Sequence, residues 1–188
     1  NADTCEKVAS DIQKETGQRC IGQQFHAGIW DDCNSLANAA LDSFGKIHIL
    51  VNNAGMSPLY DTLTDVTESL YDKVLAVNLR GPFRLSSLLG TQMQKDDGGS
   101  IINISSIASV QPTKDVIPYA AAKAGLNAMT VGLSRAFGPT VRCNCIMPGP
   151  FLTDISTHWD LEAFEKSAKE NIPLQRGGQP EEIVGAAL

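Results

Sequence analysis

The sequence has no long hydrophobic run and little excess of positive charge. No apolar stretch approaches the roughly eighteen residues that a membrane-spanning helix requires. Lysine and arginine number 15 against 21 aspartates and glutamates, so the net charge at pH 7 is −6. This balance provides no basic field to hold a nucleic-acid backbone or an anionic membrane surface. The composition therefore argues against a nucleic-acid-binding or membrane role.

The first residues also lack the basic start and apolar core of a secretory signal peptide. Cysteine is scarce and odd in number, with five residues at positions 5, 20, 33, 143 and 145. We therefore expect reduced thiols in a cytoplasmic protein rather than a disulfide framework. Cys143 and Cys145 are separated by one residue, and no second pair follows that would complete a zinc site, so we expect no bound metal.

What the sequence does contain is an alternation of short apolar runs and longer amphipathic ones. Hydrophobic residues make up 43% and charged residues 19%, as in an ordinary globular protein, and the 188 residues suit a single domain spanning 1–188. The periodicity predicts helices over 3–16, 32–44, 67–94 and 118–137, and strands over 19–25, 47–52, 100–105 and 141–147. Gly17 and Gly45 should end the first two helices, and Gly81-Pro82 should bend the third.

Strands and helices in this alternation predict a parallel sheet covered on both faces. We therefore expect an α/β fold with a Rossmann-like, doubly wound, three-layer architecture. Open sheets of this kind bind ligands beyond the carboxyl ends of their strands. Three predicted strand ends, at 52–55, 105–106 and 147–149, should border one crevice.

Tyr119 and Lys123 lie four residues apart on the predicted helix 118–137, so they share a face one turn apart. A free tyrosine has a pKa of about 10, too high for ready proton exchange at neutral pH. A nearby ammonium group favours the phenolate, so we expect Lys123 to lower the pKa of Tyr119. Taken alone, the pair is equally compatible with two ordinary neighbours on a helix.

The surrounding motifs give the pair more weight, because together they resemble the short-chain dehydrogenase/reductase family over nearly the whole chain. Tyr119-Ala120-Ala121-Ala122-Lys123 is similar to the family's active-site helix. Ser106, thirteen residues before Tyr119, is similar to its catalytic serine, and Ser105 fits that spacing less well. Asn78 is similar to its helix asparagine. Further similar motifs are Asn52, Asn53, Ala54 and Gly55; Pro148, Gly149 and Thr153; and the stretch 173–182.

The resemblance implies an oxidoreductase that transfers a hydride between NAD or NADP and a carbonyl or secondary-alcohol substrate. Tyr119 would donate the proton to the carbonyl oxygen, and Ser106 would hydrogen-bond the same oxygen. Lys123 would stabilise the tyrosinate and hold the nicotinamide ribose, while Asn78 would hold a water for proton relay. The implied cofactor-binding set is Asn52, Asn53, Ala54, Gly55, Tyr119, Lys123, Pro148, Gly149 and Thr153.

The likeness has gaps. The family's first strand, its glycine-rich phosphate turn and its last strand find no match in the sequence, so the choice between NAD and NADP stays open. His26 stands where the family has an aspartate beside the adenine. His48 stands where it often has another, although packing at the start of a strand accounts for a histidine there. An alanine also replaces the serine within the active-site helix.

The resemblance further places a substrate lid at about 150–175 and a homodimer or homotetramer contact on the helices carrying 80–83 and 120–125. The apolar residues of the lid indicate a partly hydrophobic substrate, although ordinary packing explains Trp159 and Phe164 equally well. The overall pattern is similar to 3-oxoacyl-carrier-protein reductases. The same scaffold also serves sugars, polyols, steroids and small ketones.

Each candidate has a structural alternative. Asn78 could satisfy buried backbone groups at a helix bend, Ser106 could cap a turn, and Thr153 could cap a helix. For the whole protein, the alternative is a scaffold or nucleotide-sensing protein that kept the fold and lost catalysis. A simple phosphate-binding or flavodoxin-like module does not account for the spacing between Ser106 and Tyr119.

Overall fold

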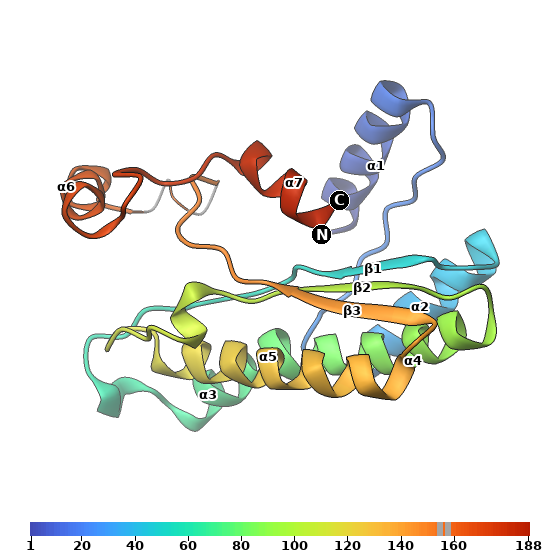
Figure 1. Cartoon of the computed structure of the whole chain (residues 1–188), viewed down its shortest axis with the longest axis horizontal. Coiled ribbons are helices and arrows are strands. Elements are labelled where there is room, and N and C mark those ends of the chain that lie inside the picture. The colour runs from blue at the N-terminus through green and yellow to red at the C-terminus, as the bar shows by residue number, and fades with distance from the viewer. Residues whose placement is uncertain (154–155, 157–158) are drawn as a thin grey trace.

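A computed structural model, which describes residues 1–153, 156 and 159–188, shows a parallel sheet flanked by helices (Figure 1). The strands are β1 (Ile49–Asn52), β2 (Gly99–Ile104) and β3 (Val141–Ile146), and they lie side by side in that order. The register pairs Asn52 with Asn103 and Asn103 with Cys145. Because both pairings are parallel, all three strands end at the same edge. The predicted α/β, Rossmann-like fold is confirmed.

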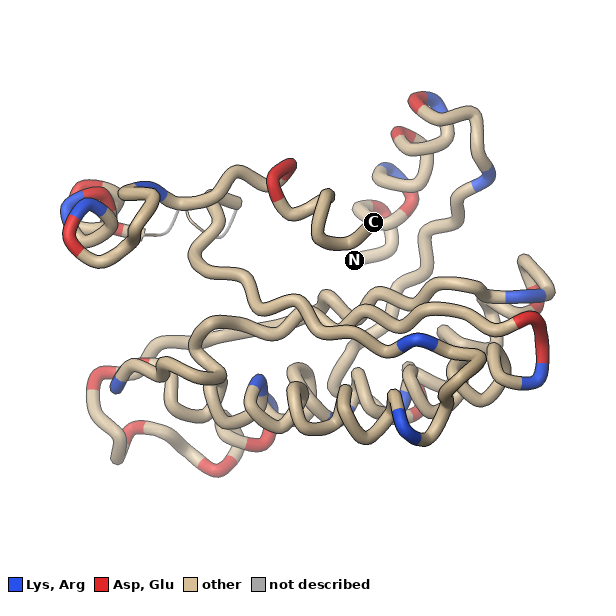
Figure 2. The backbone as a smooth tube through the Cα atoms, viewed as in Figure 1, with Lys and Arg blue, Asp and Glu red and all other residues tan. Residues whose placement is uncertain are grey.

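The helices that accompany this sheet are α1 (Ala2–Thr16), α2 (Trp30–Phe44), α3 (Glu68–Leu75), α4 (Gly81–Lys95), α5 (Ile117–Phe137), α6 (Leu161–Asn171) and α7 (Val184–Ala187). In Figure 1, α2, α4 and α5 cover one face of the sheet, and α1 and α7 lie on its other side. Acidic and basic residues are interspersed along α1 and α6 (Figure 2). Among the described residues, no helix is both long and apolar enough to cross a membrane.

Local signals in the sequence set the ends of the first helices. The Asn1 side chain caps α1 by accepting a hydrogen bond from the Thr4 amide at 2.9 Å. Gly17 and Gly45 follow α1 and α2 with φ of 69° and 74°, a backbone conformation that glycine adopts most readily. These two predicted helix ends are confirmed.

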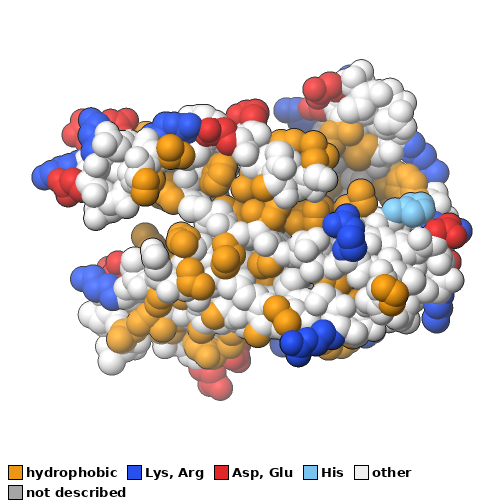
Figure 3. Space-filling model, viewed as in Figure 1, with side chains coloured by type: hydrophobic (Ala, Val, Ile, Leu, Met, Phe, Trp, Pro, Cys, Tyr) orange, Lys and Arg blue, Asp and Glu red, His pale blue; other side chains and the backbone are white. Residues whose placement is uncertain are grey.

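The hydrophobic core lies between the sheet and the layer formed by α4 and α5. Its centre includes Met93 and Ile101, which are both fully buried. β1 behaves differently on its two faces. Leu50 packs against the core, whereas Ile49 and Val51 are 64% and 51% exposed on the opposite face. Hydrophobic side chains also gather between the sheet and the elements beyond it on the face shown in Figure 3.

The strand predicted at 19–25 is wrong. These residues adopt no strand, and none of the three described strands pairs with them. The segment packs instead against α1, so closely that a Cβ on Gly22 would lie 2.4 Å from the backbone of Cys5. Strand propensity expresses packing against a paired neighbour, so an apolar run without such a neighbour stays irregular.

The helix predicted over 67–94 is interrupted, but not where the sequence suggested. A π-helical turn, Ala76–Arg80, separates α3 from α4 just before Gly81-Pro82. The adjoining helix start is crowded, because a Cβ on Gly81 would lie 1.8 Å from the Ala27 carbonyl oxygen. Arg80 also donates to the carbonyl of Gly28 at 2.6 Å. Close packing against Ala27 therefore requires glycine at this position.

We expect Gly81→Ala to lower the free energy of unfolding by about 1–3 kcal/mol, because its methyl group must displace backbone. The matched control is Gly132→Ala in α5, where nothing lies within 4 Å of the added Cβ. That change should raise stability by about 0.5–1 kcal/mol through helix propensity. Chemical denaturation of both variants measures the difference, and equal stabilities would contradict the close approach.

Candidate active site

Two hydrogen bonds fasten α5 to the end of β2. The Lys123 ammonium donates to the carbonyl of Ile104 at 2.6 Å, and the Ser105 hydroxyl donates to the carbonyl of Lys123 at 3.2 Å. Both Lys123 and Ser105 are buried. The two bonds run in opposite directions between the same two segments. They therefore hold the face of α5 that carries Tyr119 over the carboxyl edge of the sheet.

The Ser106 and Tyr119 hydroxyls meet at this edge. The Ser106 hydroxyl lies close enough to the Tyr119 phenol to lower the pKa of that phenol. Its oxygen also accepts from the Ala108 amide at 3.1 Å, so Ser106 caps the short turn Ile107–Ser109 as well. Ser105 turns its hydroxyl toward α5 instead. The structure thus brings together the pair that the spacing selected, and the capping alternative for Ser106 holds at the same time.

The electrostatics of Tyr119 differ from expectation. Burial raises the pKa of Tyr119 above its ordinary value, and the nearby Ser106 hydroxyl offsets only part of this rise. The Lys123 nitrogen lies 5.6 Å from the centroid of the Tyr119 ring and gives its hydrogen bond to Ile104. The predicted lowering of the tyrosine pKa is therefore wrong in this arrangement, because loss of hydration outweighs an ammonium that is bound elsewhere.

Lys123 itself titrates close to neutrality. Burial lowers the pKa of Lys123 to about 8, although the nearby Cys145 thiol opposes that change. A lysine in this range can both hold and release a proton under ordinary conditions. Of the two groups that the sequence paired, the lysine is therefore the better suited to exchange protons with its surroundings.

Asn78 lies fully buried within the π-helical turn Ala76–Arg80. Its amide donates to the carbonyls of Met56 at 2.8 Å and Val74 at 2.9 Å, and its oxygen accepts from the Met56 amide at 3.2 Å. The side chain therefore clips the loop after β1 to the irregular turn. The structural alternative considered for Asn78, that it satisfies buried backbone groups, is what these contacts show.

The loop held by Asn78 passes close to the active-site lysine. A Cβ on Gly55 would lie 3.0 Å from the Asn78 amide oxygen and 3.6 Å from the Lys123 nitrogen. The absence of a side chain at Gly55 therefore leaves open a space that adjoins both polar groups. Asn53, Ala54 and Gly55 are all exposed at the end of β1.

Asn52 belongs to a different environment from the three residues that follow it. Its amide donates to the Ser86 hydroxyl at 3.0 Å and to the Asn103 oxygen at 2.8 Å. Asn103 in turn donates to the Thr130 hydroxyl on α5 at 2.9 Å. This buried polar chain ties β1, β2, α4 and α5 together. The sequence analysis did not single out Asn103 and Thr130, although a polar residue inside the apolar run 100–105 was a signal.

The segment after β3 completes the edge. The Pro148 carbonyl accepts from the Ile107 amide at 2.9 Å, which links this segment to the turn that carries Ser106. Gly149 is exposed and has no heavy atom within 4 Å of the position of a Cβ. Thr153 is exposed, and its carbonyl accepts from the backbone amide and hydroxyl of Ser156 at 2.8 and 2.6 Å.

The predicted lid is described only in part, because residues 154–155 and 157–158 lie outside the described residues. Within the remainder, Phe151 pairs with Gly178 in an isolated bridge. The rings of Trp159 and Phe164 pack at 5.3 Å between centroids. Local packing thus accounts for both aromatic residues, as the alternative reading held.

His26 and His48 lie apart from the active-site residues, and a third residue, Tyr60, contributes to the site although the sequence did not predict it. His26 accepts the Gly28 amide at 3.1 Å in a local turn, and His48 is exposed rather than packed. Tyr60 was not predicted, since an isolated tyrosine in a loop gives no signal in one sequence. Its hydroxyl accepts from the Ile117 amide at 2.9 Å and donates to the Lys114 carbonyl at 2.8 Å, which fixes the start of α5.

The arrangement suits a nucleotide cofactor better than a metal. Asn53, Gly55 and Gly149 are exposed at the ends of β1 and β3. The Lys123 ammonium nearby can donate to ribose hydroxyls. Within the described parts of the chain, no three histidine, cysteine, aspartate or glutamate side chains gather as a metal site.

The whole chain, residues 1–188, matches the family model described as enoyl-(acyl carrier protein) reductase. It is 34% identical over 182 residues to the dehydrogenase/reductase SDR family member 4 of Pongo abelii, covering 96% of this chain and 65% of that protein. The chain thus spans slightly less than two thirds of the length of this curated relative.

Solved structures agree with this match. L-sorbose reductase from Gluconobacter frateurii, complexed with NADPH and L-sorbose, aligns with a TM-score of 0.90 and 25% identity, over 100% of this chain and 75% of that one. A 7α-hydroxysteroid dehydrogenase complexed with NADH and 7-oxo glycochenodeoxycholic acid aligns with a TM-score of 0.91 and 29% identity, over 100% and 72%.

The burial of Lys123 should make stability depend on pH above neutrality. Its pKa is about 8 in the folded chain against an ordinary value of 10.5, so between these values the unfolded state holds a proton that the folded state has lost. The free energy of unfolding should therefore rise with pH in this window. The expected gain is about 2 kcal/mol between about pH 7 and about pH 9.5.

Lys123→Met is the matched comparison, because methionine keeps an unbranched side chain without the titrating group. Denaturation midpoints of both proteins at the two pH values isolate the lysine contribution as a difference. The gain should be absent from the variant. A variant that gains as much stability as the parent protein would show that Lys123 is not the group responsible.

Proposed function

The chain belongs to the short-chain dehydrogenase/reductase family, and from this premise we propose that the full-length protein is an NAD- or NADP-dependent oxidoreductase. It transfers a hydride between the nicotinamide and a carbonyl or secondary-alcohol substrate. The observation that carries the proposal is that the Ser106 hydroxyl, the Tyr119 phenol and the buried Lys123 lie together at the carboxyl edge of the sheet. Two hydroxyls so close together can contact one substrate oxygen.

The proposed chemistry assigns one task to each of these side chains. The cofactor, when bound, supplies or accepts the hydride. In the reductive direction, Tyr119 donates a proton to the carbonyl oxygen while Ser106 hydrogen-bonds the same oxygen. The raised pKa of Tyr119 keeps the phenol protonated and ready to donate. Lys123, with a pKa of about 8, returns the proton to the tyrosinate.

The proposed cofactor site uses both exposed strand ends. Tyr119 and Lys123 hold the nicotinamide ribose, and the remaining contacts come from Asn53, Ala54, Gly55, Pro148, Gly149 and Thr153. Asn52 supports this site from the core, because its amide is engaged with Ser86 and Asn103. The two solved relatives named above contain NADPH and NADH, so the proposal covers NADP and NAD alike.

For Asn78 we propose a place in the proton relay. Both hydrogens of its amide are bound to backbone carbonyls, so among its side-chain atoms only the amide oxygen, which also accepts from the Met56 amide, can bind a water. That oxygen and the Lys123 nitrogen border the space left open at Gly55. A water held there would connect Lys123 with solvent.

The proposed substrate is a ketone or secondary alcohol, with a 3-oxoacyl thioester or a similar ketone as the narrower suggestion. The family model is named for an acyl-carrier-protein reductase, and the solved relatives were complexed with a sugar and a bile-acid derivative. We propose a cytoplasmic location, which the five free cysteines support. A catalytically silent nucleotide-sensing protein is the alternative, and the retention of Asn78, Ser106, Tyr119 and Lys123 argues against it.

Replacing the proton donor tests the proposed chemistry. Tyr119→Phe in the full-length protein should lower kcat with a ketone panel by about 100-fold or more, because only the hydroxyl is lost. Cofactor affinity should stay within about threefold, since phenylalanine keeps the ring. Absorbance of reduced nicotinamide follows turnover and its fluorescence follows binding. A Tyr119→Phe variant with full activity would overturn the assignment.

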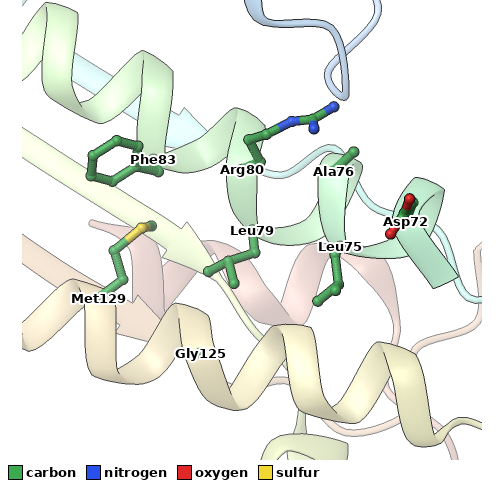
Figure 4. Close-up of a pocket in the computed structure, with 8 residues that line it drawn as sticks. All are labelled: Asp72, Leu75, Ala76, Leu79, Arg80, Phe83, Gly125 and Met129. Atoms are coloured by element: carbon green, nitrogen blue, oxygen red, sulfur yellow. The ribbon is translucent and has the colours of Figure 1, made fainter.

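We also propose a homodimer or homotetramer. A groove of about 620 Å³ lies between the π-helical turn, the adjoining ends of α3 and α4, and α5. Figure 4 shows the residues that line it. Phe83, which lines it, is 45% exposed. Gly125 on α5 packs closely against Leu79 of the π-helical turn. A Cβ added at Gly125 would lie 3.0 Å from a methyl group of Leu79. The groove is lined by Asp72, Leu75, Ala76, Leu79, Arg80, Phe83, Gly125 and Met129.

Phe83→Glu should shift the full-length protein toward monomer in analytical ultracentrifugation, because a carboxylate would be buried in the contact. Leu63→Glu, at an exposed residue outside the groove, serves as the control and should leave the assembly unchanged. A parent protein that sediments only as monomer would refute the proposed oligomer.

A further inference from the structure

One side chain on α5 joins the three segments that border the active site. Asn127 lies one helical turn beyond Lys123 and two turns beyond Tyr119, so the three share a face. Its amide nitrogen donates to the Ser109 hydroxyl at 2.8 Å, with the Met147 sulfur at 3.4 Å. Its amide oxygen accepts from the Cys145 thiol at 3.3 Å. Asn127 thus contacts the turn after β2 and the end of β3.

The bond to Ser109 continues to the catalytic serine. The Ser109 hydroxyl donates to the Ser106 carbonyl at 2.6 Å, while its distance to the Met147 sulfur is 3.6 Å. A hydroxyl has one hydrogen to donate, and the shorter, oxygen-directed contact is the stronger one. An unbroken path therefore leads from Asn127 through Ser109 to the backbone of Ser106.

We propose that Asn127 is a positioning residue that, through Ser109, fixes the Ser106 hydroxyl relative to the Tyr119 hydroxyl. Tyr119 and Asn127 belong to one continuous helix, so a bond from Asn127 to the turn places both hydroxyls in the same rigid frame. This inference rests on the proposed oxidoreductase function. It adds to that function a residue whose effect on the reaction is exerted entirely through Ser106.

The turn that follows Ser106 depends on hydrogen bonds to neighbouring segments to hold its position. It is a three-residue 3-10 turn, Ile107–Ser109, too short to be held by its own hydrogen bonds. Its other anchor to a neighbouring segment is the bond from the Ile107 amide to the Pro148 carbonyl at 2.9 Å. That bond reaches the segment after β3 and makes no connection to α5. The bonds of Lys123 and Ser105 tie α5 to the residues just before Ser106. Asn127 adds a tie from the same helix to the other end of the turn, at Ser109, and a small displacement of the turn reduces the rate.

Ser109→Ala in the full-length protein breaks the path while leaving Asn127 in place. We expect kcat to fall about tenfold and KM for the ketone to change less than about twofold, because the loss is one of alignment. Ser109→Thr, which keeps the hydroxyl, should restore most of the rate. Ser134→Ala is the matched control. Ser134 lines the same cavity as Asn127, but its hydroxyl bonds only within α5, to Val131.

A double-mutant cycle distinguishes an effect on the position of the Ser106 hydroxyl from a non-specific disturbance of the active-site structure. With Ser106→Ala already present, adding Ser109→Ala or Asn127→Leu should cost no further activity, since both act through the Ser106 hydroxyl. Effects that multiply in the double variants would overturn the inference. So would a Ser109→Ala variant as active as Ser134→Ala.

A titration that needs no turnover provides the second reading. The Tyr119 ring resonance, assigned with Tyr119→Phe, should report a higher tyrosine pKa in Ser109→Ala, as in Ser106→Ala, because the nearby Ser106 hydroxyl lowers that pKa. An unchanged pKa would contradict the positioning role. Because this reading stands even for a protein that turns over no ketone, it distinguishes failure of the positioning role from failure of the proposed activity.

Discussion

The exchange of hydrogen bonds between Lys123 and the end of β2 is the constraint on which the rest of the site depends. The ammonium binds the Ile104 carbonyl, and the Ser105 hydroxyl binds the carbonyl of Lys123. Parallel pairing brings the strand ends to one edge, but it does not decide which face of α5 meets them. These two bonds do, and they thereby set Tyr119 beside Ser106. The buried chain from Asn52 through Asn103 to Thr130 secures the same helix further inside the core.

Burial acts on the two titrating groups in opposite directions. It raises the pKa of Tyr119 and lowers that of Lys123 to about 8, so the tyrosine is kept as an acid while the lysine can exchange protons near neutrality. A charged lysine in the core costs stability, as groups retained for function often do. In the proposed relay, the Tyr119 hydroxyl gives its proton to the substrate, and Lys123, connected with solvent through a water near Asn78, restores that proton.

The sequence predicted what depends on local pattern and spacing. The helix ends at Gly17 and Gly45 follow from local rules, and the parallel strands follow from the alternation of strands and helices. The preference for Ser106 over Ser105 came from the spacing in the family resemblance. The prediction failed where contacts with distant segments determine the structure. Residues 19–25 form no strand because none of the described strands pairs with them. The π-helical turn forms where Asn78 binds the loop after β1. Likewise, spacing places Lys123 near Tyr119 but cannot show that its ammonium is bound to another segment, so the direction of the tyrosine pKa was wrong.

The central claim is that the Ser106 and Tyr119 hydroxyls act on one substrate oxygen. A crystal structure of the full-length protein with its nicotinamide cofactor and a ketone or alcohol ligand tests it most directly. The account predicts that both hydroxyls lie within about 3 Å of the ligand oxygen, in hydrogen-bonding geometry. A ligand oxygen that contacts neither hydroxyl, or a reactive carbon facing another wall of the site, would contradict it.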